Sequence, residues 1–478
     1  MSRKFLFPLL FLLGSFPNKL LAQDLSAQSS SAQTTWEGKL GNIRIILHLS
    51  EDALSRQMTA EYDSPDQGAF GLKVSELKIK GDSLSAYSSV IGGGFAGTFN
   101  TGKTELSGKW KQGGGELPLV LKITANKEVF KRPQTPKAPF PYQEQKVIYY
   151  NKDKSIQYGA TLTLPRSDKE VPAVILITGS GQQDRDETLF GHKPFWVIAD
   201  HLSRNGIAVM RVDDRGIGES TGDVMNATSL DFAQDVLVGI DYLKTHKGVD
   251  IKKIGLIGHS EGGVIAPLVA VQTKDVAFII SLAGVGVKGA DLLKKQFRHS
   301  YSNLNLSKEE LNRLDSLTQM MIQLSDKYTE DELKSAFAQS MEDWLERQPD
   351  TFLVKVGLKG PNADSYINEM ASRFFLPWMR YFIKYDPSTT LTKITIPVLA
   401  LNGGKDTQVD AKENLAGFDK LLTQAGNKNI KTVLFPNLNH LFQNAETGGL
   451  DEYAAIKETI SPEVLTTITQ WIHTLYDL

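Results

Sequence analysis

The sequence of 478 residues contains no cysteine. A disulfide framework, a thiolate nucleophile and a cysteine-bound metal centre are therefore excluded. Net charge is also nearly absent, because 53 Lys and Arg residues oppose 55 Asp and Glu residues. No long basic run occurs, so neither nucleic acid nor an anionic membrane surface is an expected partner. The eight histidines are scattered and no H-E-x-x-H pattern is present, so we expect no metal site and no cofactor.

The N-terminal apolar run, Phe5 to Phe16, is shorter than the ~20 residues that a membrane-spanning helix needs. Arg3 and Lys4 precede it and Ala22 follows it, a layout typical of a secretory signal peptide over residues 1–22. A membrane anchor is the alternative. We therefore expect cleavage after Ala22, no stable membrane insertion of the mature chain, and export to a bacterial periplasm or out of the cell.

Segment 36–125 has the features of a small β-rich domain. Apolar and polar residues alternate in stretches such as Leu77–Lys80, and glycine-rich turns such as Gly113–Gly115 separate these stretches. We expect an antiparallel sheet or half-open barrel, which either braces the rest of the chain or holds a substrate or partner. Four prolines between residues 131 and 143 then predict a stiff linker at 126–145.

From residue 146 onwards, short apolar runs such as Ala173–Ile177 alternate with amphipathic helical stretches. This pattern predicts an α/β domain with a mostly parallel sheet that is covered on both faces. Segment 287–386 interrupts the alternation, because it is helical, charged and poor in strands, with a capping box at Ser307 and Glu310. Since connections in such sheets are short, we expect the α/β domain at 146–286 and 387–478, with a helical cap inserted at 287–386.

The motif Gly258-His259-Ser260-Glu261-Gly262 follows the predicted strand Ile254–Ile257 and precedes a helix-compatible run. A G-x-S-x-G motif in this context places its serine on a tight strand-to-helix turn, where the hydroxyl is exposed above the sheet. The motif alone is common by chance, and the strand and helix on either side make it specific. The sequence therefore predicts Ser260 as a nucleophile.

A serine nucleophile needs a histidine base and a carboxylate that orients the base, and in this arrangement the chain order is Ser, acid, His. Asp406 follows the predicted strand Val398–Leu401, and His440 follows the predicted strand Thr432–Phe435. Asp410 is the alternative acid, with Asp406 then a turn residue. His259 adjoins the serine and is expected to pack, while His473 lies within the last helix.

The oxyanion that forms during acyl transfer requires two N–H donors. One donor is expected from Glu261, directly after the nucleophile. The other is expected from the loop after Ile177, where we choose Ser180, with Gly181 or Gln182 as alternatives. A simple loop without this role is the competing interpretation.

Several motifs together resemble one protein group. These motifs are Gly179–Asp186, Asp213–Ser220, Gly258–Gly263, Asn402–Val409, Asn439–Phe442 and Asp63–Gly68. In them the chain is similar to bacterial secreted α/β-hydrolase serine esterases, which carry a β-rich N-terminal domain and an inserted helical cap. The resemblance covers nearly the whole mature chain and implies carboxylesterase activity, commonly on short acyl groups, with the same three residues. Thr178 departs from the wider superfamily, where histidine often precedes the oxyanion glycine, and this leaves the donor in that loop open.

The end of the cap is rich in aromatic residues, of which Phe375, Trp378 and Tyr381 are expected either to line the substrate pocket or to pack in the cap core. We predict a serine carboxylester hydrolase that acts on a small-molecule or glycan-linked ester of short-to-medium acyl length. Activity should decline below about pH 6–7, because His440 must be neutral to act as a base. The alternatives are a serine peptidase or amidase, a thioesterase or acyltransferase with the same triad, and a binding protein with a vestigial site.

Overall fold

The computed structural model describes residues 32–41, 43–51, 56–65, 69–89, 91–112, 115–124, 132–361 and 363–476. The expected signal peptide at 1–22 lies outside the described residues. So do residues 66–68 of the N-terminal motif and the first part of the expected linker.

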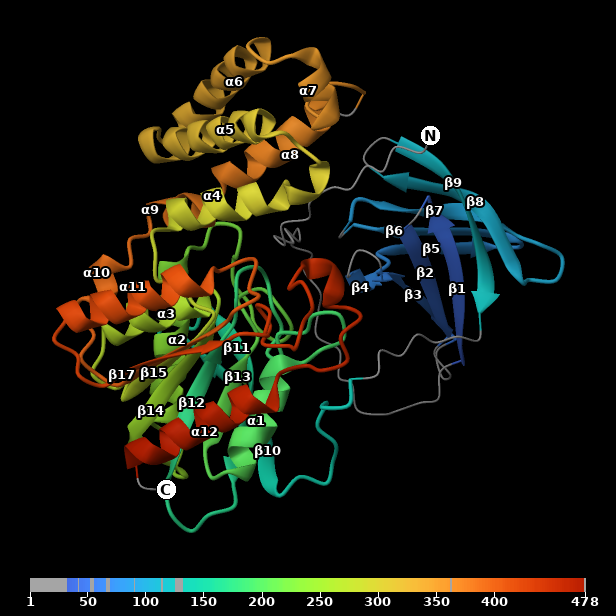
Figure 1. The fold of residues 1–478 in the computed structure, drawn as a ribbon. Helices are drawn as coiled ribbons and strands as arrows, with labels where there is room; N and C mark the ends of the chain where they lie inside the picture. The colour runs from blue at the N-terminus through green and yellow to red at the C-terminus, as the bar shows by residue number, and fades with distance from the viewer. Residues whose placement is uncertain are drawn as a thin grey trace.

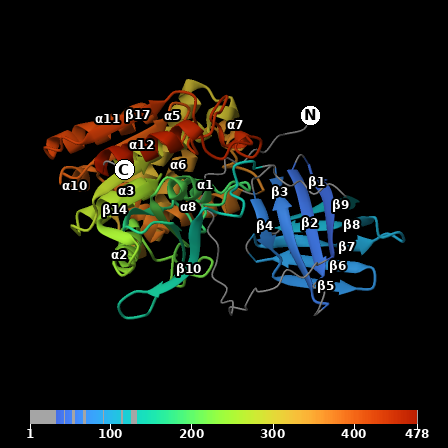
Figure 2. The ribbon, with the colours of Figure 1, turned by 90° about the horizontal axis from the view of Figure 1, so that it is seen from below.

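The N-terminal domain is a nine-stranded antiparallel half-barrel with the strand order β4-β3-β2-β1-β9-β8-β7-β6-β5. Alternate side chains of its strands point inward, and Trp36, Tyr62, Phe95 and Trp110 are buried between them. Figure 2 shows this domain beside the rest of the molecule. Its strands are β1 (Ala32–Leu40), β2 (Ile43–Glu51), β3 (Met58–Ser64), β4 (Ala69–Lys73), β5 (Glu76–Lys80), β6 (Ser83–Ser88), β7 (Gly93–Phe99), β8 (Glu105–Gln112) and β9 (Gly115–Thr124).

The second domain contains an eight-stranded sheet with the order β10-β11-β13-β12-β14-β15-β16-β17. Its strands are β10 (Tyr142–Tyr150), β11 (Gln157–Pro165), β12 (Val171–Ile177), β13 (Ala208–Val212), β14 (Val249–His259), β15 (Phe278–Leu282), β16 (Val398–Gly403) and β17 (Ile430–Phe435). The pairs β10–β11 and β11–β13 are antiparallel, and the remaining pairs are parallel. β10 begins at Tyr142, inside the stretch 126–145 that we predicted as linker, and the β10–β11 hairpin was not among the predicted strands.

Helices cover both faces of this sheet, which explains why its central strands are uniformly apolar. One face packs against α1 (Pro194–Arg204) and α12 (Pro462–Tyr476). The other face packs against α2 (Ser229–Leu243), α3 (Gly262–Ala270) and α11 (Ala411–Gln424). The short helix α10 (Ser388–Leu391) leads into β16.

Between β15 and β16 the chain forms a helical cap, which Figure 1 shows as a separate layer of helices above the sheet. The capping box is confirmed, since the Ser307 hydroxyl accepts a bond from the Glu310 N–H and the Glu310 carboxylate accepts one from the Ser307 N–H. The cap helices are α4 (Gly289–Ser300), α5 (Lys308–Lys327), α6 (Glu330–Glu346), α7 (Asp350–Lys355), α8 (Ala363–Phe375) and α9 (Pro377–Lys384).

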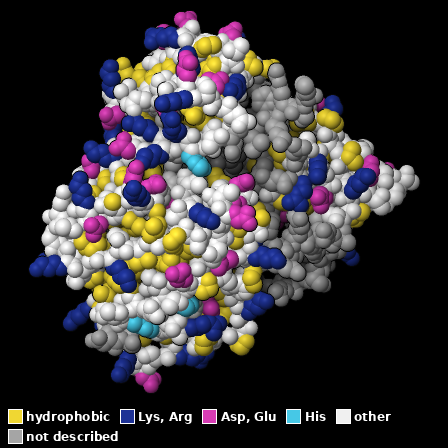
Figure 3. Space-filling model, in the orientation of Figure 1, with side chains coloured by type: hydrophobic (Ala, Val, Ile, Leu, Met, Phe, Trp, Pro, Cys, Tyr) yellow, Lys and Arg dark blue, Asp and Glu magenta, His cyan; other side chains and the backbone are white. Residues whose placement is uncertain are grey.

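The segment that leads from the half-barrel to β10 is docked against the second domain. The Arg132 guanidinium donates to the carbonyl groups of Phe190, Ala454 and Ile456, and Gln134 bonds to the backbone at residues 459 and 460. On the face drawn in Figure 3, basic and acidic side chains are interspersed. Among the helices in the described ranges, none has the length and apolar character that crossing a bilayer requires.

Candidate active site

Ser260 stands where β14 ends and α3 begins, on a turn of the strained kind that its motif predicts. Its φ of +52° is rare for a residue with a side chain, and its N–H donates to the Leu282 carbonyl at 2.8 Å. The turn requires glycine on either side, because a Cβ at Gly258 would lie 2.0 Å from the Gly262 carbonyl oxygen, and one at Gly262 would lie 2.2 Å from the Ile177 carbonyl oxygen. The two glycines therefore allow the strand, the turn and the helix to pack closely around the half-buried serine.

His440 and Asp406 meet at the carboxyl ends of neighbouring strands β17 and β16. His440 Nδ1 lies 2.7 Å from Asp406 Oδ2, and both side chains are almost completely buried. The other oxygen of Asp406, Oδ1, accepts the N–H groups of Gln408 and Val409, each at 2.8 Å. Because the carboxylate accepts from Nδ1, the Nε2 atom of His440 remains available as a base.

The competing acid, Asp410, has a different role. Its side chain accepts the Glu413 N–H at 3.0 Å and caps the N-terminus of α11. The structure therefore brings Asp406, and not Asp410, to His440. His473 bonds to the carbonyl of Asn205, on the loop between α1 and β13.

His259, the chain neighbour of Ser260, contacts His440. The rings of His259 and His440 have centroids 4.8 Å apart, and His259 Nε2 lies 3.0 Å from the His440 carbonyl oxygen. Within the described part of the chain, no hydrogen bond joins the Ser260 hydroxyl to the His440 ring. Bonds of this kind are often long without substrate and shorten in the reacting complex.

The two expected oxyanion donors, Ser180 and Glu261, both line the cavity that contains Ser260. In the ranges that the structure describes, neither of their N–H groups has a hydrogen-bond partner. Glu261 is the N-cap residue of α3, so its N–H stands at the positive end of the helix dipole. Two unpaired donors beside a nucleophile are the arrangement that a developing oxyanion needs.

Buried carboxylates hold the loop that carries Ser180. The Asp214 carboxylate accepts hydrogen bonds from the Thr178 hydroxyl at 2.7 Å and from the Gln183 N–H at 2.9 Å. It therefore binds the loop on both sides of Ser180. Burial raises the pKa of Asp214 well above its usual range. Next to it, the Arg185 guanidinium binds both oxygens of Asp213. Burial opposes ionisation of Asp213, but these bonds outweigh it and lower its pKa.

Sequence reasoning gave no role to Glu187, which lies in the same loop. Glu187 Oε1 accepts the Gly179 N–H at 2.8 Å and lies 2.9 Å from His259 Nδ1. Both side chains are buried. No local pattern predicts the contact, because its partners are 72 residues apart.

Glu261 also links the nucleophile turn to the cap. Its buried carboxylate accepts the Trp378 indole N–H and the Ser229 hydroxyl, both at 2.6 Å. Burial raises the pKa of Glu261, and the two hydrogen bonds only partly offset this rise. The carboxylate of Glu261 thus joins α2, the turn and cap helix α9.

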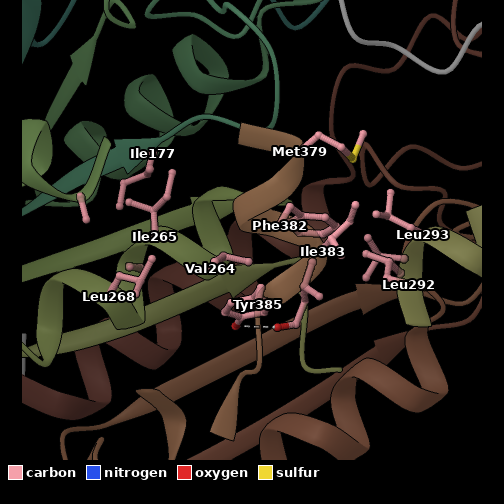
Figure 4. Close-up of a cluster of buried hydrophobic side chains, with 14 of the residues drawn as sticks. Ile177, Val264, Ile265, Leu268, Leu292, Leu293, Met379, Phe382, Ile383 and Tyr385 are labelled. Atoms are coloured by element: carbon pink, nitrogen blue, oxygen red, sulfur yellow. Dashed lines mark hydrogen bonds between the residues drawn. The ribbon is translucent and has the colours of Figure 1, made fainter. Parts of the chain in front are cut away.

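The cavity above Ser260 has a volume of about 220 Å³ and lies between the sheet and the cap. Of the three aromatic residues predicted for the pocket or the cap core, Trp378 lines this cavity, whereas Phe375 and Tyr381 are not part of its wall. Phe375 instead packs edge-on against Phe337, with ring centroids 5.6 Å apart. Figure 4 shows four apolar residues of the cap side of the cavity, Leu292, Leu293, Met379 and Phe382. Besides Trp378, the other apolar residues of the wall are Val285, Phe297, Val409 and Leu450.

The described residues of this site do not form a recognisable metal-binding cluster. Over the described ranges, no group of three or more His, Asp or Glu side chains is placed to hold a metal ion.

Numbered within the second domain, the strand order is 1-2-4-3-5-6-7-8, with Ser260 after the fifth strand, Asp406 after the seventh and His440 after the eighth. This order, with a serine on the turn after the fifth strand, defines the architecture. The chain has the α/β-hydrolase fold.

Comparisons with known proteins show similarity to hydrolases. A family model described as serine aminopeptidase, S33, matches residues 195–342, a range that includes Ser260. Esterase EstD of Thermotoga maritima is 26% identical over 314 residues, which cover 65% of this chain and 64% of the esterase. The α/β-hydrolase thus spans less than two thirds of that relative's length.

The chain is also similar to solved structures of low sequence identity. The esterase PF2001 of Pyrococcus furiosus is 15% identical and has a TM-score of 0.43, with 70% of this chain and 91% of that chain covered. The α/β-hydrolase GrgF of Penicillium sp. sh18 is 16% identical and has a TM-score of 0.43, with 70% and 100% covered.

Proposed function

We propose that this α/β-hydrolase is a serine carboxylester hydrolase that acts through an acyl-enzyme on esters of short-to-medium acyl length. The observation that carries the proposal is the 2.7 Å bond between His440 and Asp406, next to a serine on a strained turn. The sequence similarity to a protein named esterase EstD supports the proposal independently of the geometry.

In the first step His440 Nε2 takes the proton of Ser260 as the hydroxyl oxygen attacks the ester carbonyl carbon. The resulting oxyanion is stabilised by the N–H groups of Ser180 and Glu261. His440 then gives its proton to the departing alcohol as the ester C–O bond breaks, which leaves an acyl group on Ser260. In the second step His440 takes a proton from water as the water oxygen attacks the acyl carbon. His440 then returns this proton to the Ser260 oxygen as the bond between Ser260 and the acyl group breaks, and the carboxylic acid leaves.

The wall of the cavity supports an apolar acyl group. Leu292, Leu293, Phe297, Met379 and Phe382 come from cap helices α4 and α9. Burying a charged acyl group against this surface would be costly. The cavity wall also contains charged and polar side chains, among them His299, Arg373 and Asp451, so the apolar group is proposed for the α4 and α9 part of the wall alone. A glycan-linked ester fits the proposal if its sugar stays outside this apolar part.

A panel of nitrophenyl esters of graded acyl length tests the proposal with the wild type and Ser260→Ala. The wild type should hydrolyse the shorter esters, and Ser260→Ala should lower kcat by at least about a thousandfold while its thermal unfolding stays unchanged. Retained activity in Ser260→Ala would remove Ser260 from the mechanism.

A serine aminopeptidase is the second candidate, because the matching family model carries that description. An aminopeptidase must bind a substrate ammonium group. The Glu261 carboxyl on the cavity wall is a weak partner for it, because burial raises its pKa and Trp378 and Ser229 already bind it, whereas Asp451 on the same wall is an alternative partner. Aminoacyl anilides, run beside the esters, separate the candidates, since faster cleavage of the anilides would favour the peptidase.

Export to a periplasm or out of the cell also belongs to the proposal. It rests on the basic start and short apolar run of residues 1–22. N-terminal sequencing of the protein from a bacterial host should find a chain that starts at Gln23, and an intact residue 1 would contradict it.

A further inference from the structure

Three loops supply the reacting groups of the proposed mechanism, and one buried pair connects all three. The loop after β12 carries Ser180, the turn after β14 carries Ser260, and the loop after β17 carries His440. Glu187 binds the Gly179 N–H of the first loop, and His259 belongs to the second and contacts the carbonyl of His440 in the third.

The positions of the protons in this pair follow from what its neighbours can do. The His440 carbonyl can only accept, so His259 Nε2 must carry a proton. The Gly179 N–H can only donate, so Glu187 Oε1 accepts there. One more proton must lie between Glu187 and His259 Nδ1, because two lone pairs would otherwise face each other at 2.9 Å. The pair therefore holds one shared proton and carries no net charge.

The surroundings of the pair agree with this description. Burial opposes a charged imidazole, but the Glu187 charge and its hydrogen bond, together with the bond to the His440 carbonyl, raise the pKa of His259. Glu187 itself adopts a left-handed φ of +53°, a conformation that persists only where surrounding contacts hold it. From this backbone position its side chain reaches both Gly179 and His259.

We propose that Glu187 and His259 act as a positioning pair, which sets the oxyanion loop and the backbone of His440 relative to Ser260. The proposal rests on the esterase mechanism proposed above. Neither residue reacts with substrate. Their contacts fix the distances between the donors, the nucleophile and the base, and errors of about 1 Å in such distances can lower a rate by roughly a hundredfold.

Glu187→Gln tests the proposal because it preserves shape and removes the charge. A glutamine cannot support a doubly protonated His259, so His259 must lose its bond to either position 187 or the His440 carbonyl. On nitrophenyl acetate we expect kcat to fall roughly tenfold to a hundredfold, with KM within about twofold of wild type, because alignment and not ground-state binding is lost.

The single variant His259→Gln and the double variant Glu187→Gln/His259→Gln complete the test. The double variant buries no charge, so it stays informative if either single variant fails to fold. If the two residues act through each other, its kcat should be no lower than that of the worse single variant. Multiplied losses of the two single variants, or a wild-type kcat in the double variant, would overturn the proposal.

Asn427→Ala is the matched control for a purely structural effect. Its buried amide donates to the carbonyls of Ile394 and Ile396. Asn427 and these residues precede the amino ends of β17 and β16, whereas Asp406 and His440 follow the carboxyl ends. The Asn427→Ala substitution should lower the unfolding temperature and leave kcat near wild type. A kcat in Glu187→Gln no lower than that of Asn427→Ala would refute positioning. An active Ser260→Ala in the same series would instead refute the esterase mechanism itself.

Discussion

The substitution Asp406→Asn tests whether the Asp406 carboxylate orients His440 for catalysis or only stabilises the fold. In the structure Asp406 Oδ1 faces two backbone donors, the N–H groups of Gln408 and Val409, each at 2.8 Å. An asparagine must place its amide oxygen there and its NH₂ group toward His440 Nδ1, because the opposite orientation would set donors against donors. His440 then has to accept at Nδ1, so its proton moves to Nε2, where the base is needed.

The expected loss follows from this change of tautomer. A histidine with its proton on Nε2 cannot take the proton of Ser260, and loss of the correct tautomer in such a triad lowers kcat by about 10⁴. That factor corresponds to about 5.4 kcal/mol of transition-state free energy, since each tenfold change is about 1.36 kcal/mol. Two backbone bonds are retained, so thermal unfolding should change little.

The assay is the initial rate on nitrophenyl acetate at neutral pH, with Asp410→Asn as the matched control. Asp410 carries the same charge four residues away but caps α11, and asparagine caps helices as well as aspartate does. Asp410→Asn should therefore keep wild-type kcat. An Asp406→Asn variant within about tenfold of wild type would refute the orienting role of Asp406.

Three further predictions concern stability and substrate choice. Burial and the Arg132 charge lower the pKa of His192 to about 4, whereas an unfolded histidine titrates near 6.5. The unfolded chain therefore binds this proton first as pH falls, and about 3 kcal/mol of unfolding free energy should be lost between pH 7 and pH 4. His192→Gln should lack this component in urea unfolding, and parallel pH curves for the two proteins would contradict it. Trp378→Ala enlarges the cavity and should raise kcat/KM for long over short acyl esters by about tenfold or more, and an unchanged ratio would show that Trp378 does not limit acyl length. Gly258→Ala places a Cβ 2.0 Å from the Gly262 carbonyl oxygen and should lower the unfolding free energy by about 2 kcal/mol or more, so wild-type stability would contradict the close packing of this turn.

Elements with strong local signals could be predicted from the sequence. The capping box at Ser307 and Glu310 predicted the start of a helix, and α5 begins at Lys308. The apolar run Ile254–Ile257 predicted the strand before Ser260, although β14 extends over Val249–His259. The β10–β11 hairpin was missed, because prolines precede it and its polar residues alternate with tyrosines, valine and isoleucine in a pattern without an apolar core run.

The candidate site divides in the same way. Chain order and strand ends predicted Ser260, Asp406 and His440, and the structure places Asp406 against His440. Contacts that depend on tertiary approach gave no signal, as in the meeting of Glu187 with His259 across 72 residues. The aromatic run 374–382 was recognised as a group, but helix geometry turns Trp378 toward Glu261 and Phe375 toward Phe337, a difference that composition does not reveal.

The central claim is that Ser260 is made nucleophilic by its surroundings. A fluorophosphonate probe, followed by peptide mass spectrometry, measures this directly. The probe should label the wild type at Ser260 and leave Ser260→Ala unlabelled, because only an activated serine attacks the phosphorus. A folded wild type without an adduct, or with its adduct at another serine, would contradict the claim and favour a binding protein with a vestigial site.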